Sequence, residues 1–161
     1  MVDSVTGDGG PSATVMRAEE AHVPDIVRLV GELRAQEELP PGISVTSVRA
    51  YLAEPQTEVF VAMAEEGTDR GGVVGLLTVR ILGDLFHDGT SAMIQELIVD
   101  GQWRGQGVGG ALLDAAVNLA RERGCAEIGV STGIQNPDAQ ALYRSRGFGA
   151  DSLWFERHFA E

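Results

Sequence analysis

The segment DGQWRGQGVGG, residues 100–110, joins a strand pattern to a helical pattern and decides the fold. The apolar stretch AMIQELIV, residues 92–99, precedes it, and apolar residues at helical spacing follow it as far as residue 123. A helix N-terminus carries unpaired backbone N–H groups and the positive end of the helix dipole. Glycines let the backbone approach an anion closely, and Arg104 adds a planar cation that suits phosphate. The turn therefore predicts a phosphate or pyrophosphate site.

Other interpretations fit this turn less well. No Gly-Lys-Ser/Thr follows it, which excludes a P-loop. Gly105, Gly107 and Gly110 match the G-x-G-x-x-G spacing of dinucleotide-binding folds, but that fingerprint belongs to the first strand-to-helix turn of its domain. Here the turn follows the third or fourth predicted strand. A tight turn without a ligand is the remaining alternative, in which four glycines within seven residues would lower stability for no return.

The rest of the chain alternates between strand and helix patterns. Helices are predicted over residues 22–38, 44–53, 106–123 and 137–146, and strands over 14–18, 58–64, 73–82, 92–99 and 127–131, with one or two more within 148–159. This order predicts an α/β fold, a mixed central sheet with helices on both faces in a three-layer α/β/α arrangement. Residues 1–13 are expected to form a flexible tail, and residues 14–161 a single domain.

Composition limits the classes of function. The chain has 161 residues and a formal net charge of -12, so it repels nucleic-acid phosphates and anionic lipid surfaces. We expect it to bind neither nucleic acid nor membrane. No apolar run approaches the roughly 20 residues of a membrane span, and the N-terminus lacks the pattern of a signal peptide. The single cysteine, Cys125, excludes an intrachain disulfide and fits a cytoplasmic location.

Two motifs resemble those of the GNAT superfamily of N-acetyltransferases. Its cofactor motif, Gln/Arg-x-x-Gly-x-Gly/Ala, is matched by Arg104, Gly107 and Gly109. The segment NPDAQALYRSRGF, residues 136–148, is similar to the family's next motif, with its Asn, Ala, Leu-Tyr and Gly-Phe at the same spacing. The resemblance covers about residues 14–159 and is specific from about 93 to 148. It implies a GNAT-like fold, acetyl-CoA as acyl donor, no metal, and a primary amine of a small molecule or peptide as acceptor.

The resemblance also implies roles for individual residues. The backbone of Ile98 and Val99 and the side chain of Asn136 are expected to bind the pantetheine arm of coenzyme A. The pyrophosphate is expected to bind backbone amides of Arg104, Gly105, Gln106, Gly107, Val108, Gly109 and Gly110. Tyr143 is expected to be the general acid that protonates the departing thiolate, since a phenol pKa of about 10 lies near a thiol pKa of about 8.5. The alternative for Tyr143 is a core aromatic residue.

The sequence leaves the catalytic base open. Gln95 and Glu96 precede the cofactor segment, where many family members carry an acid, and only Glu96 is acidic. Neighbouring strand residues point to opposite faces, so the two are not expected to share a pocket. Glu96 is the candidate base or substrate anchor, with a solvated or ion-paired carboxylate as the alternative and water as the alternative base. The Val99 amide is the candidate donor to the thioester carbonyl.

Other reactive side chains show no catalytic pattern. Cys125 and Trp103 are expected to pack in the core. Glu37 and Glu38 end the first helix near the loop that covers the acceptor site in this fold, where they either attract a cationic amine or stay solvated. The histidines show no metal-binding spacing, at His22, His87 and His158.

Two other functions and the partners stay open at this point. Gln95, where an acid is common, motivates a non-catalytic acyl-CoA-binding regulatory module, and transfer of a longer acyl group is a further alternative. The negative charge favours a cationic acceptor, but the identity of the amine is not readable from the sequence. The last strand is a candidate surface for a homodimer.

Overall fold

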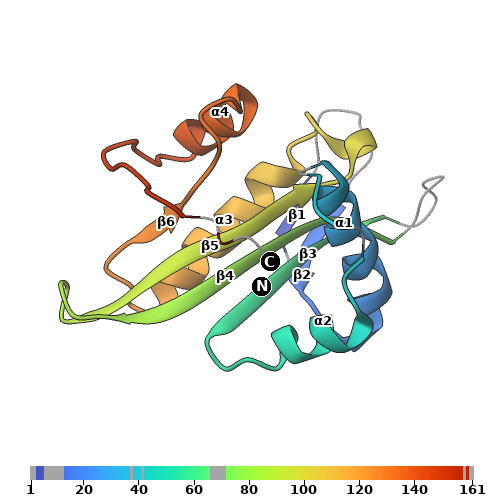
Figure 1. Cartoon of the computed structure of the whole chain (residues 1–161), viewed down its shortest axis with the longest axis horizontal. Helices are drawn as coiled ribbons and strands as arrows, with labels where there is room; N and C mark the ends of the chain where they lie inside the picture. The colour runs from blue at the N-terminus through green and yellow to red at the C-terminus, as the bar shows by residue number, and fades with distance from the viewer. Residues whose placement is uncertain are drawn as a thin grey trace.

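The computed structural model describes residues 3–5, 13–36, 38–40, 42–65, 72–157 and 159. Its described strands form one six-stranded sheet in chain order (Figure 1). They are β1 (Asp3–Val5), β2 (Ala13–Arg17), β3 (Thr57–Ala64), β4 (Gly72–Asp84), β5 (Gly89–Val99) and β6 (Ile128–Val130). Neighbours from β1 to β5 are antiparallel, and β6 joins β5 in parallel. A parallel neighbour needs a crossover connection, which the helix after the glycine-rich turn supplies.

Helices cover both faces of this sheet. They are α1 (Val23–Gln36), α2 (Val45–Leu52), α3 (Val108–Glu122) and α4 (Pro137–Ser145), with short 3-10 turns η1 (Glu20–His22) and η2 (Gly101–Trp103). Helices α1 and α2 bury Leu29 and Val48 against one face, in a cluster that includes Leu76. Helix α3 buries Leu112 and Ala116 in a separate cluster on the other face, and Figure 1 shows it behind β4 and β5. The predicted three-layer α/β/α fold is confirmed.

The start of α3 is fixed by close packing on β4. Gly75 faces it, and a Cβ at Gly75 would lie 2.9 Å from Leu112 Cδ1 and 3.0 Å from Val108 Cγ1. A side chain at this position of β4 would therefore push the helix away from the sheet. The packing holds the N-terminus of α3, where the glycine-rich turn ends, at the end of β5.

The ends of the chain differ from expectation in two places. Asp3–Val5 lies in the segment expected to be a tail, yet it pairs with β2 in the register Asp3↔Val15. Residues 148–157 and 159 were predicted to hold one or two strands and form none. Their large apolar side chains are exposed, at Leu153, Trp154, Phe155 and Phe159. Apolar content alone does not make a strand, because a strand needs a neighbour to bond its backbone. None of the described helices combines the length and apolarity needed to cross a bilayer.

Candidate active site

The glycine-rich turn places unpaired amides at the start of α3. Gly107 is the helix N-cap at φ +86°, and Gly105 also has a positive φ, +74°. Such backbone angles favour glycine over any residue with a Cβ. The helical ladder begins with Ala111 N donating to Gly107 O at 3.0 Å, so the amides of the preceding first turn lie ahead of it, at Val108, Gly109 and Gly110. These amides and the helix dipole are free to meet an anion at the place where the sequence predicts a pyrophosphate, and that binding stays a prediction.

Two arginines lie at this turn. Arg104, the predicted one, is exposed and donates from Nε to the Val99 carbonyl at 3.0 Å, which ties the turn to the end of β5. Arg146 follows α4 and reaches α3, where its Nε lies 3.2 Å from Asp114 Oδ1 and donates to Gly110 O at 3.4 Å. Arg146 is not among the residues predicted from the sequence. Its one available signal was Gly110, a glycine within a helix, which makes room for the guanidinium.

Tyr143 is brought to the same corner by its neighbour on α4. A Cβ at Gly109 would lie 3.1 Å from Leu142 Cδ2 and 3.6 Å from Val99 Cγ2, so α4, α3 and β5 meet there. Tyr143 is partly buried against the cluster on the α3 face, with its ring 6.0 Å from that of Phe148. Burial raises the pKa of the Tyr143 phenol above its usual value of 10.0, so the group keeps its proton at neutral pH.

Asn136 has a structural partner. Its side-chain oxygen accepts a hydrogen bond from Ala139 N at 3.1 Å and so caps the N-terminus of α4. The cap fixes where α4 begins and thereby where Tyr143 lies. The predicted contact between Asn136 and the cofactor arm stays a prediction.

One edge of β5 is open near its end. Among the described residues, pairing with β6 covers only Ala92 to Ile94 of β5. Asp100 N donates to Val74 O on the β4 side, so by strand alternation the backbone groups of Val99 face the open edge. The same alternation directs the backbone of Ile98 toward β4, and its side chain is buried on the α1/α2 face. Val99 therefore presents its N–H at the edge where the sequence placed the cofactor arm, while its carbonyl accepts the hydrogen bond from Arg104 Nε. The cofactor contacts predicted for Ile98 and Val99 stay predictions.

A β-bulge at Gln95 decides the direction of Glu96. The register pairs Thr78 with Glu96 but Val79 with Ile94, which leaves Gln95 as the extra residue in β5. Before the bulge, Ile94 packs on the α3 face; after it, Ile98 packs on the α1/α2 face. Glu96 shares the parity of Ile98 and points to the α1/α2 face, whereas Gln95 is exposed. The expected separation of Gln95 and Glu96 stays a prediction.

Glu96 is held by a buried threonine on β4. The Glu96 N–H donates to Thr78 Oγ1 at 3.1 Å, and the Thr78 hydroxyl donates to Glu96 Oε2. Thr78 is only 4% exposed. Tyr51 of α2 lies beside them; burial raises the pKa of its phenol, and a hydrogen bond with Thr78 opposes the rise. Sequence spacing gives no signal for this group, because its members come from three separate elements.

The remaining candidates are structural or lie elsewhere. Trp103 is 5% exposed within the core, and Cys125 packs partly buried against the same cluster, as predicted. His22 Nδ1 accepts a hydrogen bond from Glu19 N at 2.9 Å, and Glu38 is exposed in the turn after α1. Glu37 and His158 lie outside the described residues.

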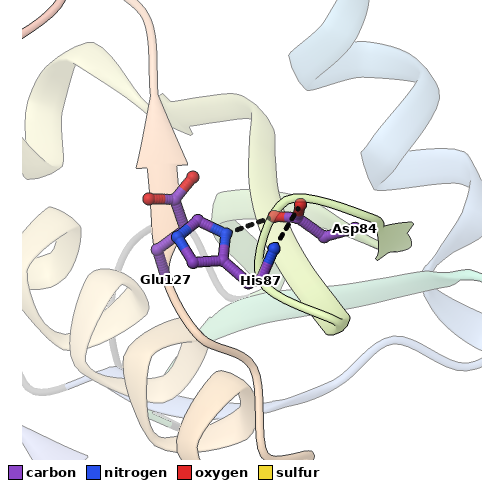
Figure 2. A group of neighbouring side chains, drawn as sticks. All are labelled: Asp84, His87 and Glu127. Atoms are coloured by element: carbon purple, nitrogen blue, oxygen red, sulfur yellow. Dashed lines mark hydrogen bonds and ion pairs between the residues drawn. The ribbon is translucent and has the colours of Figure 1, made fainter.

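Asp84, His87 and Glu127 meet at the β4–β5 hairpin, the end of β5 remote from Val99 (Figure 2). His87 Nδ1 lies 2.7 Å from Asp84 Oδ2, and one ligand-type atom from each of the three residues lies within 4.8 Å of the others. The hydrogen bond to Asp84 raises the pKa of His87. Spacing along the sequence does not indicate this cluster, because Glu127 is far from the hairpin along the chain. Asp84 already accepts a hydrogen bond from His87, so these two residues form an ion pair whenever His87 is protonated.

The sequence matches the Acetyltransferase (GNAT) family over residues 28–148. It is 34% identical over 100 residues to aminoglycoside N(6')-acetyltransferase type 1 of Stenotrophomonas maltophilia, which is 60% of this chain and 63% of that protein. It is 36% identical over 99 residues to aminoalkylphosphonate N-acetyltransferase of Salmonella typhimurium, 62% and 61% of the two chains. The matches thus span less than two thirds of these relatives.

Solved structures share the fold. A transcriptional regulator from Bacillus halodurans C-125 superposes with a TM-score of 0.77 at 28% identity, covering 91% of this chain and 99% of that one. An aminoglycoside acetyltransferase from an uncultured soil metagenomic sample superposes with a TM-score of 0.78 at 24% identity, covering 92% and 96%. With its α3 N-terminus and both motifs in place, the chain belongs to the GNAT family of acetyltransferases.

Proposed function

We propose that this enzyme transfers an acetyl group from acetyl-CoA to a primary amine of a small molecule or peptide. The observation that carries the proposal is the N-terminus of α3, where first-turn amides, the αL N-cap Gly107 and two arginines gather at the end of β5. The chain as a whole has a net charge of -12, whereas these amides and arginines are a local group of N–H donors that suits a pyrophosphate. The open edge at Val99 lies next to it and suits an extended amide-containing arm.

The proposed chemistry uses three groups of the chain. Bound acetyl-CoA supplies an electrophilic thioester carbonyl and a thiolate leaving group. The Val99 N–H, which faces the open edge of β5, donates to the carbonyl oxygen as negative charge develops there. Tyr143 donates its phenol proton to the departing sulfur. Glu96 accepts a proton from the attacking amine.

The positions of Tyr143 and Glu96 support their proposed roles as general acid and general base. Tyr143 packs on the α3 face of the sheet, and Glu96 points to the α1/α2 face. We infer that the acyl donor binds between β5 and α4 while the amine approaches from the side of α1 and α2. Acid and base then act from opposite faces on the same reacting centre at the end of β5.

The acceptor is proposed to be cationic before it reacts. The net charge of -12 attracts ammonium groups from a distance. The names of the relatives fit: one is an aminoglycoside acetyltransferase, another an aminoalkylphosphonate acetyltransferase and a third N-alpha-acetyltransferase 30 of Homo sapiens.

The proposal is tested first by binding and then by turnover. Calorimetry with acetyl-CoA should give saturable heat that Gly107→Val and Arg104→Ala weaken, whereas the control Gly83→Val, at a position with open space on β4, leaves binding unchanged. Release of coenzyme A is then measured over aminoglycosides, polyamines, amino acids and basic peptides. Absence of binding heat would remove acetyl-CoA as donor. Binding without turnover across the panel would replace the transferase by an acyl-CoA-binding regulatory module.

A further inference from the structure

We propose that Thr78 is a positioning residue, which holds the Glu96 carboxylate in place to receive the acceptor amine. This inference rests on the proposed function and deepens it. Its starting point is the bulge at Gln95, because without that extra residue Glu96 would share the α3 face with Ile94. The bulge turns Glu96 to the α1/α2 face, directly opposite Thr78 on β4.

Thr78 forms two hydrogen bonds with Glu96. Its hydroxyl oxygen accepts the Glu96 N–H at 3.1 Å, and its hydroxyl proton goes to Glu96 Oε2. Backbone and side chain of one residue are thus tied to a single hydroxyl, which restricts the rotamers of Glu96. Among the described residues, only Thr78 hydrogen-bonds to that carboxylate, and only through Oε2. The second oxygen, Oε1, is left to face an amine.

Tyr51 of α2 packs on the same face of the sheet. A threonine hydroxyl has one proton and two lone pairs, and here the proton is committed to Glu96. Burial raises the pKa of Tyr51 above 10.0, so the phenol stays a donor across the physiological range.

The surrounding charges leave the Glu96 carboxylate available. Arg80 and Glu54 are the other charged groups that act on Tyr51, together with Glu96 itself. Arg80 is paired with Glu54 at 3.0 Å, so this nearby cation is engaged by a different carboxylate. Within the described part of the chain, Glu96 forms no ion pair with an arginine. A negative group that is fixed, partly buried and without a cationic partner is suited to an ammonium or amine.

The test compares removal of the Thr78 hydroxyl with its retention. Thr78→Val keeps the shape and removes the hydroxyl, and Thr78→Ser restores it. With the best acceptor of the amine panel, Thr78→Val should lower kcat about 10- to 100-fold while KM for acetyl-CoA stays within about twofold. Thr78→Ser should recover most of the turnover. Thr90→Val, a partly buried threonine at the other end of the sheet, is the matched control and should leave both constants unchanged.

The outcomes separate this inference from the proposed function. Equal kcat in Thr78→Val and wild type, or an equal loss in Thr78→Ser and Thr78→Val, would overturn it. Full turnover in Glu96→Gln would also overturn it while leaving acetyl transfer intact. If the wild-type protein acetylated no amine, the proposed function would fail. Amide NMR would still test whether Thr78 holds Glu96 by hydrogen bonds. The chemical shift of the Glu96 amide should change in Thr78→Val and remain that of wild type in Thr78→Ser. An unchanged shift in Thr78→Val would contradict the hydrogen bond between Glu96 N–H and Thr78.

Discussion

The guanidinium of Arg146 lies directly over Gly110, so that a Cβ at Gly110 would be 2.1 Å from Arg146 Nη2. The two residues are 36 positions apart and belong to the end of α4 and the first turn of α3. Through this contact and the ion pair with Asp114 at 3.2 Å, the helix that carries Tyr143 is joined to the first turn of α3. Gly110 therefore serves packing between helices as well as the predicted cofactor site.

The first prediction concerns this coupling. In an Arg146→Ala background, Gly110→Ala should stabilise the protein by about 0.5–1 kcal/mol, because alanine favours helix over glycine. In wild type the same change displaces the guanidinium from Asp114 and Gly110 O, so the gain should be reduced or lost. Urea denaturation of the four proteins of the cycle measures the difference. Identical effects in both backgrounds, within about 0.3 kcal/mol, would show that the two residues are not coupled.

The packing of α3 on β4 gives a second prediction. Gly75→Ala should destabilise the protein by about 1–3 kcal/mol, because the added methyl would meet Leu112 Cδ1 at 2.9 Å and Val108 Cγ1 at 3.0 Å. Gly83→Ala on the same strand meets no atom within 4 Å and serves as the control. Denaturation midpoints measure both. Equal midpoints for the two variants would argue against the tight contact at Gly75.

The third prediction concerns Tyr143 as general acid. Tyr143→Phe keeps the ring that packs near Phe148 and removes the proton, so kcat should fall about 100-fold or more while KM for acetyl-CoA changes little. Because burial raises the Tyr143 pKa above 10.0, its ionisation should not lower wild-type turnover below about pH 10. Steady-state kinetics across pH check both points. A fully active Tyr143→Phe enzyme would remove Tyr143 from the mechanism.

The fourth prediction concerns the pair at the β4–β5 hairpin. Asp84 raises the pKa of His87 above 6.5, and His87 lowers the pKa of Asp84 below 3.8. The His87 contribution to stability is therefore complete below about pH 6.5 and is lost as pH rises through its folded pKa. The Asp84 contribution is present above pH 3.8 and is lost as pH falls through its folded pKa. An NMR titration of His87 should give a midpoint above 6.5 that Asp84→Asn lowers; an unchanged midpoint would contradict the pairing.

Much of the fold was predictable because its signals are local. The N-cap Ser44, whose side chain accepts a hydrogen bond from Ser47 N, marks the start of α2 close to the predicted boundary. Gly124, at φ +67°, follows the C-cap Arg123 of α3, and glycine is the residue most common at this place after a helix. Strand patterns likewise located β3, β4 and β5 to within a few residues. The strands expected after residue 148 were wrong because no local signal tells whether a sheet edge is there to receive them.

The sequence by itself determined the glycine-rich turn at the start of α3 and the acetyltransferase family, because both are marked by short local patterns. Glycines at positive φ, an arginine and a following amphipathic helix act within a few residues of each other. The tertiary structure alone decided how Glu96, Thr78 and Tyr51 meet and how Arg146 reaches Gly110. A one-residue bulge reverses the face of every side chain beyond it, and contacts between distant elements depend on packing that no spacing along the chain encodes.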